Sequence, residues 1–299
     1  MKILVTGAKG QLGTEILRQA EAQGFSHMGV DLPEWDITSL DRVNELIASY
    51  GPIVVVNAAA YTQVDRAEAE PDAAWAVNAE APKYLAEVCS LQDVPLIHIS
   101  TDFVFDGTNP QPYTEEDPIG PLSVYGMSKA AGEAHVRERI DRHLIVRTSW
   151  LYGVYGNNFV KTMLRLATER ETLRVVDDQR GCPTCAADLA AALLVLCKAV
   201  YGAPTVRWGT YHYCGQGVTS WYGFAKAAIE MAANRIPIKM KTIEPIATEQ
   251  YPTPAKRPAY SALNCDKIRQ VFGITPRPWR ESLKETIDIL VNRTTKEAS

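Results

Sequence analysis

Short, continuously apolar runs alternate with amphipathic stretches along the first half of the chain. The runs expected to be strands lie at residues 2–7, 26–31, 53–60, 95–100 and 143–149. A strand that is apolar on both faces must be covered on both faces. Strands joined through helices run parallel, because the crossover returns the chain to the same end of the sheet. The alternation therefore predicts an α/β fold with a doubly wound parallel sheet of the Rossmann type.

The pattern loosens after residue 150. Helices are expected near 157–170 and 186–200, a strand is expected near 209–214, and prolines crowd between 236 and 258. This change predicts a second, smaller part of the molecule. We expect two domains: a dinucleotide-binding domain from 1–150 with a return of roughly 158–215 to the same sheet, and a C-terminal substrate-binding lobe from about 216–299 plus 151–157.

The composition is that of a globular protein, with 46% hydrophobic and 22% charged residues. A net charge of -4 offers no basic surface for nucleic acid or an anionic membrane. No apolar run reaches bilayer-spanning length, and the first residues lack the apolar core of a signal peptide. We therefore expect a cytoplasmic protein that binds a small molecule, with no nucleic-acid or membrane partner.

The cysteines are expected to be reduced thiols in that compartment. Cys182 and Cys185 have the spacing of zinc ligands or of a redox pair, but no second close pair completes a tetrahedral site. We therefore expect no metal. The six are Cys89, Cys182, Cys185, Cys197, Cys214 and Cys265.

A glycine-rich loop, VTGAKGQLG, follows the first expected strand and opens the first helix. Gly7 lets the chain turn, Gly10 lets the backbone approach a pyrophosphate, and Gly13 lets the helix pack on the strand. The N-terminus of the helix would face the phosphates. The loop predicts a dinucleotide cofactor, and a plain tight turn is the alternative.

Asp31 ends the second expected strand. A carboxylate there accepts hydrogen bonds from the ribose 2′-OH of NADH and repels the 2′-phosphate of NADPH. Asp31 thus favours NADH, although a solvated acid at a strand end is the alternative. Asp36 and Ile37 are expected to border the adenine.

Tyr-x3-Lys occurs twice, as Tyr125/Lys129 and Tyr222/Lys226. Four residues make one helical turn, so each pair shares a helix face. Only the first pair follows a strand that ends in polar residues, where ligands of a doubly wound sheet gather. We therefore expect Thr101, Tyr125 and Lys129 to converge beside the cofactor.

These residue types suit the reduction of a carbonyl group. Charge builds on the carbonyl oxygen when hydride reaches its carbon, so the oxygen needs a proton. The ammonium of Lys129 is expected to lower the pKa of the Tyr125 phenol and to bind ribose hydroxyls. The Thr101 hydroxyl can donate to the same oxygen.

The sequence resembles the extended short-chain dehydrogenase/reductases, and within them the dTDP-4-dehydrorhamnose reductase family. The similarity covers nearly the whole chain and is far more specific than a glycine triplet. It rests on TGAKGQLG, NAAAYTQVDRAE, STDFVFDG, YGMSKAAGE, RTSWLYG, NNFVKTML, DDQRGCPT with DLA, GTYHYCGQGVTSWYGFA, RPAYSALN and WRESL.

The resemblance implies a role for each residue that matches a family motif. Thr101, Tyr125 and Lys129 would be the catalytic triad. The cofactor would contact Gly7, Gly10, Gln11, Leu12, Gly13, Ala60, Tyr61, Thr62, Tyr125 and Lys129. The substrate would contact Thr62, Val64, Thr101, Asp102, Trp150, Asn158 and Arg257. Trp150 would pack against the deoxysugar ring, and Arg257 would reach the diphosphate or thymidine end.

The implied reaction reduces the C4 ketone of dTDP-4-dehydro-L-rhamnose with NADH or NADPH, giving dTDP-L-rhamnose. Tyr125 would donate the proton. The expected assembly is a monomer or a homodimer, and Mg2+ is implied by the resemblance alone.

Three alternatives share this fold. A sugar-nucleotide dehydratase would carry Glu after Asp102, where this chain has Phe103. An epimerase would retain NAD+ and consume no cofactor. A non-catalytic regulatory subunit, resembling the β subunit of methionine adenosyltransferase, would bind NADP(H) without turnover.

Overall fold

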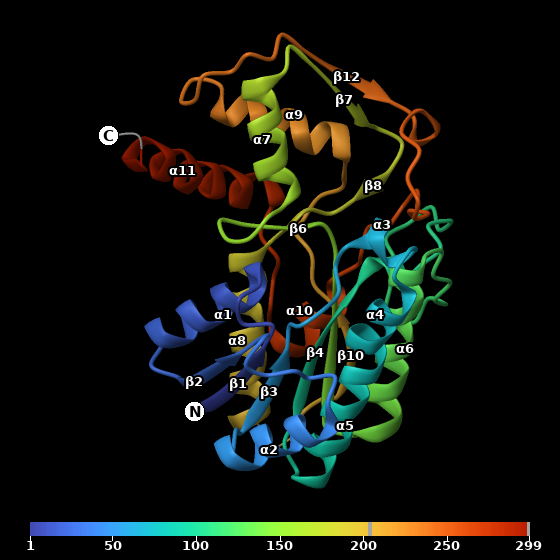
Figure 1. Cartoon of the computed structure of the whole chain (residues 1–299), viewed down its shortest axis with the longest axis vertical. Coiled ribbons are helices and arrows are strands. Elements are labelled where there is room, and N and C mark those ends of the chain that lie inside the picture. Colours follow the sequence, from blue (N-terminus) through green and yellow to red (C-terminus); the bar gives the residue numbers. More distant parts are fainter. Residues whose placement is uncertain (203–204, 298–299) are drawn as a thin grey trace.

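The computed structural model describes residues 1–202 and 205–297, so the last two residues of the expected C-terminal lobe lie outside it. Figure 1 shows a large sheet with its helices and a smaller group of elements above it, which we call the cap. The cap consists of α7 (Phe159–Glu169), β7 (Thr172–Val176), α9 (Trp221–Ala232), β12 (Thr242–Ile246) and α11 (Trp279–Glu297).

Six parallel strands form the main sheet in the order β10-β5-β4-β3-β1-β2. The chain moves from β2 on one side of β1 to β3 on the other, so the strand order reverses between β1 and β3. Ligands of such sheets bind at this reversal, outside the carboxyl ends of the strands. The strands are β1 (Lys2–Thr6), β2 (Ser26–Val30), β3 (Val54–Asn57), β4 (Leu96–Thr101), β5 (His143–Thr148) and β10 (Gly209–His212).

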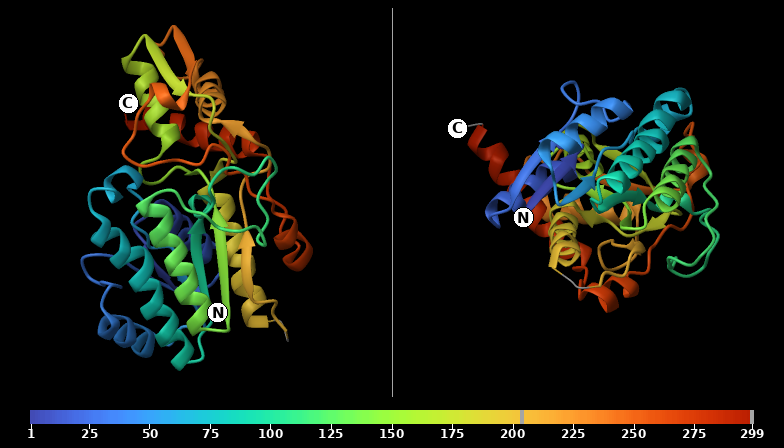
Figure 2. Two further views of the ribbon diagram at one scale, coloured as in Figure 1. Left: turned by 90° about the vertical axis from the view of Figure 1, so that its right-hand side faces the viewer. Right: turned by 90° about the horizontal axis from the view of Figure 1, so that it is seen from below.

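Helices cover both faces of the sheet (Figure 2). Residues of α1 (Gln11–Ala22) and α8 (Ala186–Gly202) share one core, and residues of α2 (Leu40–Tyr50), α5 (Ala81–Leu91) and α6 (Val124–Arg139) share the other. Strand β3 supplies both, because alternate side chains of a strand point to opposite faces. Val54 and Val56 enter the first core and Val55 the second. The predicted doubly wound sheet is confirmed.

Helix α6 is fastened to the sheet by a buried ion pair. The Arg147 guanidinium on β5 donates from Nε and Nη2 to the two Glu133 oxygens, over 2.8 and 2.7 Å. Burial alone would raise the pKa of Glu133, but the bonds and charge of Arg147 hold it below its ordinary value. Ser123 caps the N-terminus of helix α6, because its hydroxyl accepts from Gly126 N–H at 3.2 Å.

The helical stretch between β3 and β4 is interrupted. It consists of α4 (Pro71–Trp75), a π-helical turn η1 (Ala76–Glu80) and α5. Pro82 has no N–H to donate to the Asn78 carbonyl one turn earlier, which accounts for the wider turn. That carbonyl instead lies against Gly132 of α6, where a Cβ would come within 2.1 Å of it.

The cap has its own strand pair and its own core. β7 pairs in parallel with β12, and α9 packs against both α7 and α11. Thus α8 and β10 lie with the main sheet, whereas α7 and β7 of the stretch 158–215 lie in the cap. No helix in the described ranges is both long and apolar enough to cross a bilayer.

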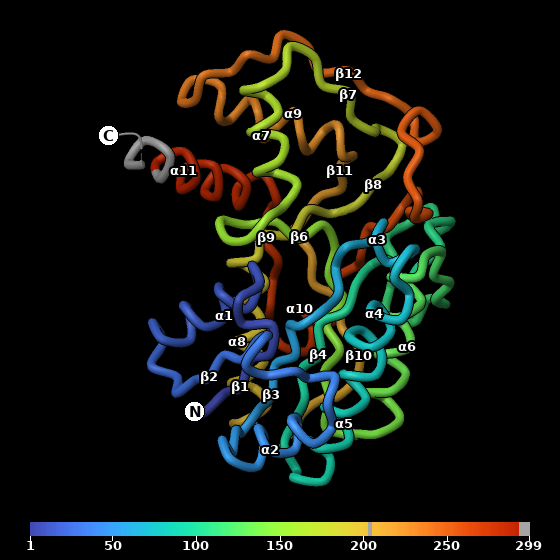
Figure 3. Tube along the Cα trace, in the orientation of Figure 1, coloured from blue at the N-terminus to red at the C-terminus, as the bar shows by residue number. Residues whose placement is uncertain are grey.

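Short elements lie at the junction of the two parts, where β6 and β9 run side by side (Figure 3). β6 follows β5 along the chain, so this pair lies where the chain leaves the carboxyl end of the main sheet and enters the cap. These and the remaining elements are α3 (Val64–Ala67), the 3-10 turn η2 (Asp102–Val104), β6 (Leu151–Tyr152), β8 (Arg180–Gly181), β9 (Thr184–Cys185), β11 (Thr219–Ser220), the 3-10 turn η3 (Thr248–Gln250) and α10 (Asp266–Phe272).

Candidate active site

The glycine loop lies between β1 and α1 and packs against the end of β3. Gly7 has φ +69°, and a Cβ there would come within 2.6 Å of the Ala59 backbone. A Cβ at Gly13 would come within 2.2 Å of the Gly7 carbonyl, so helix and strand approach closely only because both residues are glycine. Exposed Gly10 caps α1 without a side-chain hydrogen bond. The first N–H groups of α1 are therefore open to a phosphate, and the loop fits a pyrophosphate.

Gln11 and Leu12 follow the loop but face different surroundings. The Gln11 amide donates to the Leu151 carbonyl at 3.3 Å, which links the loop to β6. Leu12 is buried in the core, so its backbone alone is available to a cofactor.

The Asp31 carboxylate lies against the glycine loop. Its Oδ2 accepts from Lys9 N–H at 2.8 Å and its Oδ1 from Leu32 N–H at 2.9 Å. The Lys9 ammonium turns the other way and pairs with Glu34 at 2.9 Å.

Asp36 and Ile37, also expected near the adenine, have other contacts. Asp36 accepts from the N–H and the hydroxyl of Thr38, at 2.9 and 2.7 Å. Ile37 packs against the core behind β2 and β3. The contacts of Asp36 and Ile37 are therefore with other parts of the protein.

The segment after β3 carries Ala60, Tyr61 and Thr62, and Val64 begins α3. Asn78 in the π-helical turn holds this segment, because its side chain accepts from Tyr61 N–H at 2.9 Å and donates to the Tyr61 carbonyl at 3.1 Å. Sequence reasoning missed Asn78, although Pro82 was a signal for the irregular turn. The rings of Tyr61 and Tyr125 belong to one apolar cluster.

Thr101 ends β4, and Tyr125 lies in the first turn of α6, which packs against that strand. The Thr101 hydroxyl donates to Asp102 Oδ1 at 3.1 Å, and its influence on the pKa of Tyr125 places it near the phenol. Phe103 packs edge-on against the Tyr125 ring, with 5.4 Å between centroids. Burial raises the pKa of Tyr125 to about 12, while the bond from Thr101 lowers it. The expected lowering of this pKa by Lys129 is not found: Lys129 is not among the groups that shift it, and its ammonium donates to the Ile99 carbonyl instead.

Lys129 follows one turn later and is 2% exposed. Its ammonium donates to the Ile99 carbonyl on β4 at 2.7 Å. Burial lowers the pKa of Lys129 to about 8, and the charge of Glu133 opposes this shift. Lys226 of the second Tyr-x3-Lys pair is half-exposed beside Glu230 on α9.

Asp102 is buried next to Thr101. Its Oδ2 has no hydrogen bond within the described part of the chain. Burial raises the pKa of this carboxyl to about 6. A buried oxygen of this kind is suited to a substrate hydroxyl, which would supply the missing bond.

Trp150 lies directly after β5 in the left-handed region, with φ +48°. Its indole stacks on Trp221, with centroids 3.7 Å apart and planes 7° apart. A Cβ at Gly181 would come within 2.6 Å of the same indole, so the backbone there packs against it. An unfavourable backbone conformation held by packing on a large ring is typical of a binding site. Sequence reasoning missed Trp221, which only tertiary contact brings to Trp150.

Asn158 caps α7, accepting from Lys161 N–H at 3.2 Å and donating to the Gly153 carbonyl at 2.8 Å. Both ends of its amide therefore have structural partners. Arg257 lies in the segment between η3 and α10. It links this segment to α3, because its guanidinium donates to the Asp65 oxygens over 3.0 and 2.7 Å. Asp65 was not anticipated from the sequence.

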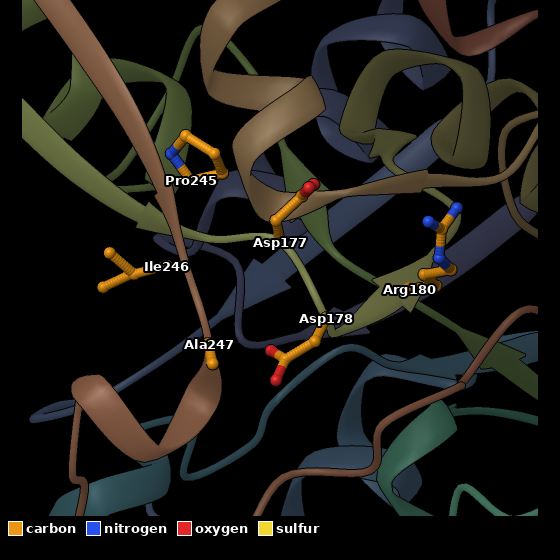
Figure 4. A pocket seen from close by; sticks show the side chains of 6 residues that line it. All are labelled: Asp177, Asp178, Arg180, Pro245, Ile246 and Ala247. Carbon is orange, nitrogen blue, oxygen red and sulfur yellow. The ribbon is translucent and has the colours of Figure 1, made fainter.

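A shallow pocket of about 510 Å³ lies where the DDQRGCPT motif meets the end of β12 (Figure 4). Asp177 accepts from the Ser220 hydroxyl, and Asp178 accepts from Thr248 N–H at 2.9 Å. Arg180 is exposed, and its guanidinium has no ion pair with any described residue. Arg180, a cation without a counter-ion among the described residues, thus directly precedes Gly181, whose backbone packs against the Trp150 indole.

The six cysteines are free, as expected. Cys214 and Cys265 lie 3.7 Å apart between sulfur atoms. Among the described residues, no group of three or more His, Cys, Asp or Glu could hold a metal ion. The described residues therefore offer no set of ligands that fits a protein-held metal.

The raised pKa of Asp102 predicts a stability effect. The folded state disfavours the ionised carboxylate, so stability falls as pH rises from about 4 to beyond about 6. We expect Asp102→Asn to raise the free energy of unfolding by about 3 kcal/mol near pH 8 and to change it little near pH 4.5. Urea denaturation at both pH values measures this.

Asp106→Asn is the matched control. Bonds from Thr108 and Tyr113 lower the pKa of Asp106, so this variant should lose stability at neutral pH. Equal losses of unfolding free energy in both variants at pH 8 would contradict the conclusion that the ionised Asp102 carboxylate destabilises the folded state.

Comparison with known proteins agrees with this geometry. Residues 1–292 match a family model described as the RmlD substrate binding domain. The dTDP-4-dehydrorhamnose reductase of Aggregatibacter actinomycetemcomitans is 45% identical over 95% of this chain and 97% of its own. The crystal structure of a dTDP-4-dehydrorhamnose reductase from Clostridium acetobutylicum superposes with TM-score 0.90 at 42% identity, covering 97% of this chain and 99% of that one.

A second solved structure carries a cofactor. The dTDP-4-dehydrorhamnose reductase of Bacillus anthracis, in complex with NADP, has TM-score 0.88 and 38% identity, covering 96% of this chain and 99% of that one. Similarity of this extent over nearly the full length identifies the family. The chain belongs to the RmlD family, in which these relatives are dTDP-4-dehydrorhamnose reductases.

Proposed function

We propose that the protein reduces the C4 ketone of dTDP-4-dehydro-L-rhamnose to dTDP-L-rhamnose with NAD(P)H, in dTDP-rhamnose biosynthesis. The observation that carries this proposal is that Thr101 ends β4 while buried Tyr125 and Lys129 lie one turn apart on α6, the helix that packs against this strand. The reductases named above, similar over nearly the whole chain, support the substrate. Free thiols support a cytoplasmic location.

Tyr125 is the proton donor. A phenol whose pKa is about 12 is fully protonated at neutral pH and holds its proton until the ketone oxygen becomes basic. The nicotinamide supplies hydride to C4. Thr101 donates to the developing oxyanion once its single hydroxyl proton turns away from Asp102 Oδ1, and Lys129 brings a positive charge toward the phenolate that Tyr125 leaves. Asp102 Oδ2 accepts from a sugar hydroxyl.

Residues argue against two of the alternatives, and cofactor use separates the third. A dehydratase requires a second carboxylate after Asp102, and Phe103 occupies that position against the Tyr125 ring. A non-catalytic subunit has no need of a buried Lys129 one turn from a buried Tyr125. An epimerase would retain its cofactor, so loss of reduced-nicotinamide absorbance on adding the keto-sugar nucleotide separates it from a reductase.

Tyr125→Phe tests the proton donor. We expect kcat to fall about a thousandfold, since general acid catalysis contributes ~10²–10⁴. The NADH dissociation constant, measured by fluorescence, should stay within about twofold, because the phenol oxygen is one contact among many.

Tyr222→Phe is the matched control from the second Tyr-x3-Lys pair and should keep near-normal turnover. A Tyr125→Phe protein with more than about a tenth of normal turnover would eliminate this donor.

We propose that the protein accepts both cofactors and prefers NADH through Asp31. The carboxylate is fixed by Lys9 N–H and Leu32 N–H, so it cannot turn away from a 2′-phosphate without losing both bonds. The Lys9 ammonium, which would favour that phosphate, is neutralised by Glu34.

Asp31→Asn keeps an acceptor and removes the charge. We expect the ratio of kcat/KM for NADPH to that for NADH to rise about tenfold, the effect of about 1.4 kcal/mol. Asp36→Asn should leave the ratio unchanged. An unchanged ratio in Asp31→Asn would show that the carboxylate does not select the cofactor.

We propose a division of work between the expected domains, in which the sheet binds the cofactor and the cap with its junction binds the sugar nucleotide. Trp150 would face the deoxysugar, and Thr62, Val64 and Asn158 would border it. Arg257 would exchange Asp65 for the diphosphate, whose oxygens match the guanidinium equally well.

Two variants break the Arg257–Asp65 ion pair from opposite sides. Arg257→Ala removes the cation, so we expect KM for the sugar nucleotide to rise at least about tenfold. Asp65→Asn frees the cation, so KM should stay equal or fall. Steady-state kinetics at saturating NADH measures both, and equal increases of KM would reduce the pair to a structural role.

A further inference from the structure

A line of buried polar side chains crosses the sheet behind the proposed catalytic residues. It runs from Thr6 on β1 through Asn57 on β3 and His98 on β4 to Lys129 on α6. Thr6 Oγ1 donates to Asn57 Oδ1 at 2.7 Å, and Asn57 Nδ2 lies 3.0 Å from His98 Nδ1. His98 Nε2 lies 3.5 Å from Lys129 Nζ. The first three side chains are fully buried, and no step proposed above uses them.

The backbone fixes the orientation of the Asn57 amide. Asn57 Oδ1 also accepts from Ala59 N–H at 3.2 Å, and a backbone N–H can only donate. The amide nitrogen Nδ2 therefore faces His98 and donates to its Nδ1. Because Nδ1 accepts a bond, the proton of the neutral imidazole lies on Nε2. Burial lowers the pKa of His98 well below its ordinary value, so the ring is neutral.

The His98 Nε2–H then points at an ammonium that has no lone pair. Two donors face each other, and their 3.5 Å separation is longer than a hydrogen bond between nitrogens. The Ile99 carbonyl is the one acceptor that the described residues offer Lys129. Two N–H groups of a buried ammonium are therefore unsatisfied until other acceptors arrive.

We propose that His98 is a positioning residue: as the Nε2–H tautomer it denies Lys129 an acceptor inside the sheet and so directs the ammonium toward Tyr125 and the cofactor ribose. The assignment of the tautomer stands on hydrogen bonds alone, whereas its catalytic consequence rests on the proposed function. The other charged groups around this line are Glu133, Arg137 and Arg147, with the His143 ring nearby on β5.

The tautomer can be measured without substrate. The chain has five histidines, so ¹⁵N-histidine labelling and two-bond ¹H–¹⁵N spectra resolve each ring. We expect one ring, assigned by its loss in His98→Gln, to remain neutral with protonated Nε2 and bare Nδ1 from pH 6 to 9. A His98 ring that carries its proton on Nδ1 would overturn the proposal, whatever the activity.

Two variants convert the donor facing Lys129 into an acceptor. His98→Gln presents an amide oxygen. Asn57→Asp presents a carboxylate that can only accept, so the single ring proton moves to Nδ1 to donate to it and Nε2 is left bare. Each variant should therefore bind the Lys129 ammonium inside the sheet. We expect the NADH dissociation constant to rise about tenfold and the alkaline limb of the kcat/KM profile to move up by about one pH unit.

His143→Gln is the matched control. The His143 ring bonds the Ile140 carbonyl through Nδ1 at 2.5 Å and does not contact Lys129, so neither quantity should change. An unmoved alkaline limb with normal NADH affinity in the folded variants would overturn the proposal. If neither variant folds, the spectra of the unaltered protein decide. A wild type with the expected tautomer but no reductase activity would refute the proposed function alone.

Discussion

The buried pair between Glu133 and Arg147 is the interaction on which the site depends. Tyr125 and Lys129 reach the end of β4 only because α6 is held in one position on the sheet, and this pair fixes that position from β5. Loss of Glu133 would strand the Arg147 charge in the core, at a cost of about 3–5 kcal/mol, whereas Glu133 would still pair with Arg137 if Arg147 were lost. Close approach completes the placement, since a Cβ at Gly126 would come within 2.3 Å of the Phe103 carbonyl.

The same burial shifts the two titrating groups of the site in opposite directions. It raises the pKa of Tyr125 and lowers that of Lys129, so it favours the neutral form of each. The phenol therefore keeps its proton reliably, and the amine holds its charge only where acceptors surround it. Access to those acceptors, rather than simple closeness of the ammonium, governs how well a phenolate is stabilised. The line of side chains behind β4 controls that access.

The sequence predicted the sheet, the glycine loop and the position of Thr101 at a strand end, because each rests on local rules, whereas the convergence of Thr101, Tyr125 and Lys129 on one point stays a prediction. Strands apolar on both faces require two layers of helices, and polar residues at strand ends converge on one edge. Trp221 and Asp65 could not be predicted, since each acts through a partner far away in the sequence, and Pro82 was the one local signal for the turn that carries Asn78. The pairing of β7 with β12 is likewise set by packing of α7 on α9, which periodicity does not encode.

Under the proposed role of Trp150 at the sugar, its setting limits how this scaffold can be redesigned for bulkier sugars. Its backbone is held in a left-handed conformation, one neighbour is the Trp221 ring, and another is a glycine that tolerates no added atom. Enlarging residue 181 would displace the indole instead of reshaping the cavity. An engineer seeking altered hexose selectivity would gain room by trimming Trp221, at the expense of the stacking that keeps Trp150 in place.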